Sequence, residues 1–287
     1  MSALAKLIED KMKELLIDGI IFNFNGMFTD MNNRVNDIAT QVGQTPQGWH
    51  PGIFSLIRNL SELVVIPIAG MILTFILCYE LITMIIEKNN MAEFDTFNLY
   101  KWIFKTFCAV FILTHTFDIV MFVFALAQNA VNNSAGIISG SLDVNVAITE
   151  LSNQLATMGV GELLGLYVQS LILRFVMMAV SICVFLIIYG RMIEIYLTIS
   201  VAPIPMSTMI NREWGNVGNN YLKALFALAF QGFLIMICVA IYAVLLQGIT
   251  SSSNIHAAIW GAVGYTILLC MTLFKTGSMA KSLFSAH

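Results

Sequence analysis

Charged side chains are scarce in this chain of 287 residues: Asp, Glu, Lys and Arg together make up only 11%. Ordinary soluble domains carry roughly a quarter charged residues. Hydrophobic residues reach 58%, which leaves little room for a soluble domain of any size. The composition therefore argues against an ordinary globular enzyme and predicts an all-α, polytopic helical membrane protein.

The sequence patterns of common enzyme and metal sites are also missing. The five cysteines lie in apolar runs without a CxxC pair, so we expect them to pack as small hydrophobic side chains. The four histidines are scattered, and no HExxH motif or glycine-rich phosphate loop is present. The net charge of −3 argues against a basic face for nucleic acid. We expect no enzymatic activity, no metal and no cofactor, although a bound phospholipid is compatible with this composition.

The N-terminal residues do not resemble a signal peptide, because charged residues from Lys6 to Glu14 interrupt their apolar positions. These apolar positions recur at helical spacing, which predicts an amphipathic helix over residues 4–20. Its apolar stripe needs a bilayer surface, another protein or the chain's own membrane domain to cover it. We expect an N-terminal interfacial region over residues 1–60 and a transmembrane domain over residues 61–287. The stripe consists of Leu4, Leu7, Ile8, Met12, Leu15, Leu16 and Ile20.

About five transmembrane spans are predicted from the apolar segments. The longest segment, Leu163 to Ile210, would be roughly twice as long as the hydrocarbon core is thick, and Pro203 and Pro205 break it. We expect it to cross once and then either project into the cytoplasm or re-enter the membrane. Trp49 and Trp102 are expected to anchor the membrane interface. The other four spans are predicted over residues 63–86, 102–127, 222–246 and 257–274.

The distribution of Lys and Arg predicts the orientation of these spans. Residues 128–161 and 247–253 contain neither residue type, whereas the other connections and the C-terminal tail do. The positive-inside rule then places the N-terminus outside the cell membrane and the C-terminus in the cytoplasm. A six-span alternative would export the basic tail. Residues 128–161 form the expected external loop, with a short helix in residues 144–158 and a surface for a partner.

Several ionisable side chains interrupt the apolar spans, at a cost of about 2.5 kcal/mol or more each unless they face a cavity, a partner or the interface. His115 and Asp118 are three residues apart, as are Arg191 and Glu194. On a helix the two members of each pair are expected to neutralise each other. Arg174 has no acidic neighbour in the sequence, so we expect Glu80 to be its partner. Local neutralisation, the lining of a channel or subunit interface, and a proton relay are the alternatives. The six residues are Glu80, His115, Asp118, Arg174, Arg191 and Glu194.

The break after the third span carries the most specific likeness to a known family. Residues Ile199-Ser200-Val201-Ala202-Pro203-Ile204-Pro205 are followed by Trp214 after a short polar turn. Together with the amphipathic N-terminus, about five spans and the long loop after the second span, this element resembles the TrbL-like inner-membrane proteins of conjugative type IV secretion systems. The compact length is most similar to versions from conjugative elements of Gram-positive bacteria.

This resemblance implies a non-enzymatic channel or platform subunit of a conjugal DNA transfer machine. It implies a homo-oligomeric ring, with a pentamer favoured, that works beside an ATPase and other membrane subunits. Single-stranded DNA with its relaxase would pass only through the assembled channel. At the level of residues, it implies only a structural role for Ala202, Pro203 and Trp214.

Two functions of other classes remain as alternatives. One is a secondary transporter with Glu80, Arg174 and the Pro203 break at its substrate site. The absence of an inverted repeat in the sequence argues against it. The other is a lipid-binding membrane scaffold with no pore of its own.

Overall fold

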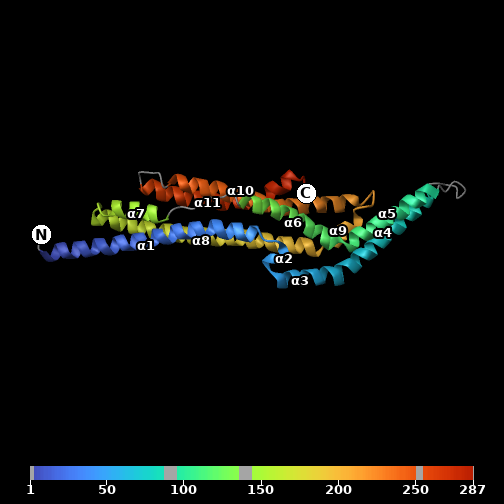
Figure 1. Ribbon diagram of the computed structural model, residues 1–287, viewed down its shortest axis with the longest axis horizontal. Helices are drawn as coiled ribbons and strands as arrows, with labels where there is room; N and C mark the ends of the chain where they lie inside the picture. Colours follow the sequence, from blue (N-terminus) through green and yellow to red (C-terminus); the bar gives the residue numbers. More distant parts are fainter. Residues whose placement is uncertain (1–2, 87–95, 136–143, 250–254, 287) are drawn as a thin grey trace. The chain divides into compact units, whose positions relative to one another are not determined.

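The computed structural model describes residues 3–86, 96–135, 144–249 and 255–286 (Figure 1). Within these ranges the regular elements are all helices and no strand occurs, which confirms the predicted all-α class. The helices are α1 (Ala3–Val42), α2 (Pro46–Trp49), α3 (Pro51–Leu60), the π-helical turn η1 (Ser61–Val65), α4 (Ile66–Ile86), α5 (Thr96–Thr114), α6 (Thr116–Ala135), α7 (Val144–Leu155), α8 (Val160–Ser200), α9 (Pro203–Thr208), α10 (Gly215–Ile249) and α11 (Ile255–Leu283).

Four helical stretches in the described ranges are long and apolar enough to cross a membrane. They are Pro51–Ile86, Val160–Ser200, Gly215–Leu246 and Trp260–Leu283. A fifth candidate is the bent pair formed by α5 and α6. These lengths and compositions confirm a polytopic helical membrane protein with four or five candidate spans.

The first span is longer than the sequence pattern indicated, because it begins at Pro51 and not near residue 63. Its helix contains the π-helical turn Ser61–Val65, which ends two residues before Pro67. A proline inside a regular α-helix lacks the N–H donor and clashes with the carbonyl of the preceding turn. The wider turn accommodates this proline without ending the helix.

The span predicted over residues 102–127 corresponds to a bent pair of helices and not to one straight helix. The helix ends at Thr114 and restarts at Thr116, and α5 and α6 are bent by 65° across His115. Three successive side chains bond the carbonyl four residues earlier: Thr114 Oγ1 at 2.9 Å, His115 Nδ1 at 3.1 Å and Thr116 Oγ1 at 2.8 Å. Side chains that bond these carbonyls compete with the helical ladder and bend the helix.

The residues of the chain group into two compact units, each with many contacts among its own residues. Unit 1 consists of Met1–Val42, Asn133–Ile188 and Ile235–Lys275. Unit 2 consists of Gly43–Asn132, Tyr189–Leu234 and Thr276–His287. Helices α6, α8, α10 and α11 therefore contribute residues to both units.

In unit 1, α1 packs along α8. The helix predicted over residues 4–20 continues to Val42, and from Ile20 onward its apolar residues are buried at intervals of three or four. Asn23 Nδ2 donates to Ser170 Oγ at 2.9 Å, and Arg34 Nη2 donates to the Met177 carbonyl at 3.2 Å. The close approach leaves little room, since a Cβ added at Gly19 would lie 2.6 Å from the Tyr167 ring.

The short helix expected in residues 144–158 is confirmed as α7, which packs on α1 and buries Leu151 and Leu155. Within the expected external loop, α6 continues to Ala135. Residues 136–143 lie outside the described part of the chain.

Unit 2 contains two apolar clusters. The larger one joins α3, α6, α8 and α10, and within it the Phe54 and Phe117 rings meet edge to face at 5.4 Å. The smaller one joins α4 and α5 through Ala69, Leu73, Ala109 and Leu113.

Trp49, for which the sequence predicts a position at the membrane interface, is half-buried and packs on two tyrosines of α8 in unit 2. Its ring centroid lies 5.1 Å from that of Tyr189 and 5.9 Å from that of Tyr196. The Tyr196 hydroxyl also donates to the Pro46 carbonyl at 2.6 Å. The tryptophan thus holds α2 against α8 within this unit.

Candidate functional site: a polar pocket beside the Ala-Pro break

The predicted helix break lies where α8 ends at Ser200 and α9 begins at Pro203. Proline is tolerated in the first turn of a helix, where its missing N–H has no intrahelical partner. Ala202 and Pro203 are buried, and Ile204 packs on the cluster that α4 and α5 form. The break therefore turns the chain so that a short helix covers α4 and α5.

The polar turn after α9 is fixed by one side chain. Asn211 Oδ1 accepts hydrogen bonds from the backbone N–H groups of Glu213 at 2.8 Å and Trp214 at 3.0 Å. An asparagine that bonds the backbone two and three residues ahead is a common device for starting a helix. Here it leads directly into α10 at Gly215.

Two glycines at the start of α10 allow the turn to close, and the sequence analysis missed both. A Cβ added at Gly215 would lie 2.9 Å from the Met209 carbonyl oxygen. One added at Gly218 would lie 2.7 Å from the Pro205 carbonyl oxygen. The Gly-x-x-Gly spacing directly after Trp214 is the signal that could have identified this contact.

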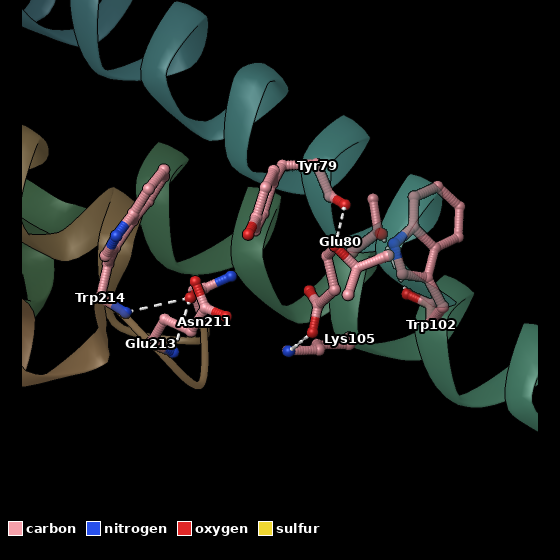
Figure 2. A network of polar contacts seen from close by, with 9 residues as sticks. Tyr79, Glu80, Trp102, Lys105, Asn211, Glu213 and Trp214 are labelled. Atoms are coloured by element: carbon pink, nitrogen blue, oxygen red, sulfur yellow. Dashed lines mark hydrogen bonds and ion pairs between the residues drawn. The ribbon is translucent and has the colours of Figure 1, made fainter. Parts of the chain in front are cut away.

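Trp214 connects the turn to α4. Its ring is stacked with the ring of Tyr79, which Figure 2 shows, and with the ring of Phe75, each at a centroid distance of 5.9 Å and nearly parallel. Aromatic contacts of this kind add about 0.5–1.5 kcal/mol each beyond the area that they bury. The tryptophan therefore stabilises the position of the turn against the first span.

A pocket of about 770 Å³ lies between α4, α5 and this turn, entirely within unit 2. Three basic side chains and two carboxylates are among its lining residues, which gives the lining a formal charge of +1. The lining consists of Tyr79, Glu80, Thr83, Met84, Asn98, Lys101, Trp102, Lys105, Asn211, Arg212 and Glu213.

An ion pair between Glu80 and Lys105 occupies the middle of this lining, with the Trp102 ring on the other side of it from Trp214 in the view of Figure 2. It uses only part of the available hydrogen-bonding capacity. Glu80 Oε2 and Trp102 Nε1 are buried, and neither has a hydrogen-bond partner among the described residues. Such atoms cost about 1–3 kcal/mol each when left unpaired. Both atoms are enclosed by the surrounding protein and are not open to the pocket.

The expected pairing of Arg174 with Glu80 is wrong, because each residue has a different partner. Glu80 pairs with Lys105. Arg174 Nη1 donates to Asn23 Oδ1 at 3.0 Å, and its guanidinium lies 5.0 Å from the centroid of the Phe22 ring. A neutral amide and an aromatic face therefore take the place of the expected carboxylate.

The local pair expected between Arg191 and Glu194 does not form a close ion pair, although Glu194 remains near enough to attract the Arg191 charge. Glu194 Oε1 lies 3.3 Å from Lys281 Nζ. Arg191 is buried, and its Nε has no hydrogen-bond partner in the described part of the chain.

The other expected local pair, His115 with Asp118, is replaced as well. His115 bonds the backbone at the bend between α5 and α6, and Asp118 is exposed. Of the six ionisable residues singled out in the sequence, Glu80 lines the pocket. The described residues include no group of three or more His, Cys, Asp or Glu side chains arranged to bind a metal.

Comparison with known proteins gives one match. A family model for TrbL/VirB6 plasmid conjugal transfer like proteins matches residues 31–203, which is more than half of the chain. The match runs from the second half of α1 through α8 to the first residue of α9, so it includes Ala202 and Pro203 but ends before Trp214. No curated protein and no solved structure matches the chain.

Proposed function

The chain belongs to the TrbL/VirB6 family of plasmid conjugal transfer proteins, and from this membership we propose that it is a non-enzymatic channel or platform subunit of a type IV secretion machine in the cell membrane. The observation that carries the proposal is the family match over residues 31–203 in a chain whose helices have the length and composition of membrane spans. Its proposed partners are the other membrane subunits and the ATPase of the machine. Single-stranded DNA with its relaxase would cross only through the assembled channel.

We further propose that several copies form a closed ring, with five subunits favoured. Arg174 supports this, because it lies on the exposed side of a candidate span and its described contacts are with a neutral amide and a ring. A guanidinium at membrane depth is costly unless it faces a partner or a water-filled lumen. Packing against a second copy, or facing the axis of a ring, would provide that cover.

Purification in mild detergent and in lipid nanodiscs, followed by mass measurement and particle imaging, tests this assembly. We expect a closed ring with cyclic symmetry. A monomer, or a two-fold dimer that persists across several detergents and nanodiscs, would contradict the channel and favour a transporter. The substrate site expected for a transporter is not formed by Glu80 and Arg174 together, since Glu80 pairs with Lys105 and Arg174 bonds Asn23.

The proposed orientation has the N-terminus outside and the C-terminus in the cytoplasm, as the distribution of Lys and Arg indicates. Single cysteines would be introduced into a variant that lacks the native ones, and intact cells would be treated with an impermeant thiol reagent. We expect labelling of Ser141→Cys and Ser252→Cys but not of Asn90→Cys or Asn216→Cys. Labelling at position 216 from outside would contradict the five-span orientation.

A further inference from the structure

We propose that the second half of α1 crosses the membrane beside α8 and that its exposed polar face lines the water-filled lumen of the assembled ring. The inference deepens the proposed function and rests on it, because only a ring of subunits encloses such a lumen. Helix α1 is not among the described helices that are apolar enough to span a membrane alone. The assignment therefore depends on what α1 packs against and on what it exposes.

Helices α1 and α8 lie side by side in unit 1 and run in the same direction (Figure 1). Asn23 bonds Ser170 and, further along both helices, Arg34 bonds the backbone of Met177. Residues 171–188 of α8 contain a single charged side chain, so this is the part of α8 best suited to the hydrocarbon core. The second half of α1 accompanies this part and therefore lies at the same depth.

The exposed face of this half of α1 is polar throughout. Between Asn23 and Val42, a stretch that the structure describes completely, seven side chains are exposed, and none of them is apolar or basic. Their spacing follows the helical repeat, so they form one stripe, roughly 22 Å long at the rise of an α-helix. The apolar residues of the same stretch are turned into unit 1 and buried. The polar stripe consists of Asn25, Thr29, Asp30, Asn33, Asn36, Asp37 and Thr40.

Lipid is an unfavourable neighbour for the polar stripe. Asp30 and Asp37 would each cost about 2.5 kcal/mol or more against acyl chains, which also offer no hydrogen bonds to the asparagine amides. The surface of α8 at this depth is of the opposite kind. Apart from Arg174, its exposed side chains over residues 171–188 are apolar, Phe175 and Ile182 among them. Unit 1 thus has one face suited to lipid and another suited to water.

A water-filled lumen also fits the polar stripe better than the surface of a second copy does. A second copy would have to supply a hydrogen-bond partner for each side chain that it buried, since buried polar groups are almost always paired. Water supplies these partners without any matching surface. Arg174 bonds Asn23, immediately before the stripe, so it lies at the edge of the same polar face. The lumen would hydrate its charge as well, which removes the cost of a guanidinium in lipid.

Cysteine accessibility of the full chain in lipid nanodiscs tests the proposal. In a variant without the native cysteines, single cysteines would replace Asn33 or Asn36 in the polar stripe, with Phe175 or Ile182 on α8 as matched controls. A charged methanethiosulfonate reagent attacks the thiolate, which forms in water and not in lipid. We expect the stripe cysteines to react at least roughly tenfold faster than the controls. Mass measurement on the same sample shows whether the ring is present.

A second measurement tests the crossing itself in intact cells. In the proposed orientation α8 runs from the outside to the cytoplasm, so a parallel α1 brings Gln47 to the cytoplasmic side, whereas the predicted spans place it outside. Gln47 is exposed. We expect an impermeant thiol reagent to label Gln47→Cys only after the cells are permeabilised. The hairpin of α4 and α5 would then enter and leave on the cytoplasmic side, in keeping with the contact between Arg58 and Phe117 that joins its two ends.

Three results would overturn the proposal and leave the ring intact. Equally fast reaction of the stripe and control cysteines would place this part of unit 1 outside the bilayer. Reaction of the stripe cysteines as slow as that of the controls, in a sample that is a ring, would show that lipid or a second copy covers the stripe. Labelling of Gln47→Cys in intact cells would exclude the crossing. A sample without a ring contradicts the proposed function itself, and the lumen with it.

Discussion

Gly218 is the position at which a single methyl group should have the largest effect on unit 2. A Cβ there would lie 2.7 Å from the carbonyl oxygen of Pro205 and 2.8 Å from the Cα of Met209. Carbon atoms in contact are normally about 3.5–4.0 Å apart. Because the opposing atoms include backbone, no side-chain rotation relieves the clash. The start of α10 and the end of α9 must therefore separate by about 1 Å.

The magnitude follows from two opposing effects of Gly218→Ala. Alanine is favoured over glycine inside a helix by about 1 kcal/mol. Overpacking of a close contact typically costs about 1–3 kcal/mol. The contact is with backbone on both sides, so we place the cost at the upper end and expect a net loss of about 1–2 kcal/mol. The melting temperature should fall by a few degrees, and the stacking of Trp214 on α4 should weaken with it.

Thermal melting followed by fluorescence-detected gel filtration, in one detergent throughout, measures this loss. The matched control is Gly70→Ala in α4, where a Cβ would meet nothing within 4 Å. The control has the same gain in helix propensity without the clash, so it should melt at or above the wild-type temperature. If Gly218→Ala melts as high as Gly70→Ala, the proposed backbone contact between α9 and α10 is wrong.

Three further predictions concern other parts of the chain. Arg174→Leu removes the hydrogen bond to the side-chain amide of Asn23 in α1, so the yield of assembled particles should fall more than with Arg212→Leu in the exposed turn. Equal, unimpaired yields of the two variants would contradict a structural role for Arg174. Replacing Pro203 and Pro205 together with Ala should allow helix to continue through the break and lower conjugal transfer without affecting membrane insertion, and wild-type transfer by the double variant would show that the break is dispensable. Gly19→Ala places its Cβ against a tyrosine ring that can move, so it should lower the melting temperature less than Gly218→Ala does; an equal loss would show that the ring is held rigidly.

Features with a local cause were predictable from the sequence. The break at residues 201–202 follows from prolines at 203 and 205, which cannot continue a helix from the preceding turn. The short helix in residues 144–158 was expected because it follows Asp143, a residue type that favours the start of a helix. Both appear in the structure with boundaries close to those expected.

The bend at His115 was missed because neither proline nor glycine marks it. Its cause is a run of three side chains, Thr114, His115 and Thr116, that all bond the preceding turn. A single threonine inside an apolar helix is common. Three consecutive side chains that bond the carbonyls of the preceding turn compete with the backbone hydrogen bonds of the helix. A Thr-His-Thr sequence in the middle of a long apolar run is thus a usable signal for a bent span.

The partners of the intramembrane charges were not predictable, since they depend on which helices adjoin. The spacing of Arg191 and Glu194 along α8 favoured an ion pair between them, but Glu194 pairs with Lys281. The pocket was missed for a related reason. Lys101, Lys105 and Arg212 contribute to the predicted orientation, and the sequence does not show that residues 98–105 and residues 211–213 line one pocket.

The start of α1 leaves a row of apolar side chains uncovered, with Leu7 60% and Leu15 70% exposed. The charged residues from Lys6 to Glu14 are three basic and three acidic, so their charges cancel, and two ion pairs form within the helix. Attachment of this segment to any surface must therefore come from apolar area, with little help from long-range attraction. Washing membranes with concentrated salt or changing the proportion of anionic lipid should leave it in place, whereas a small amount of detergent should release it.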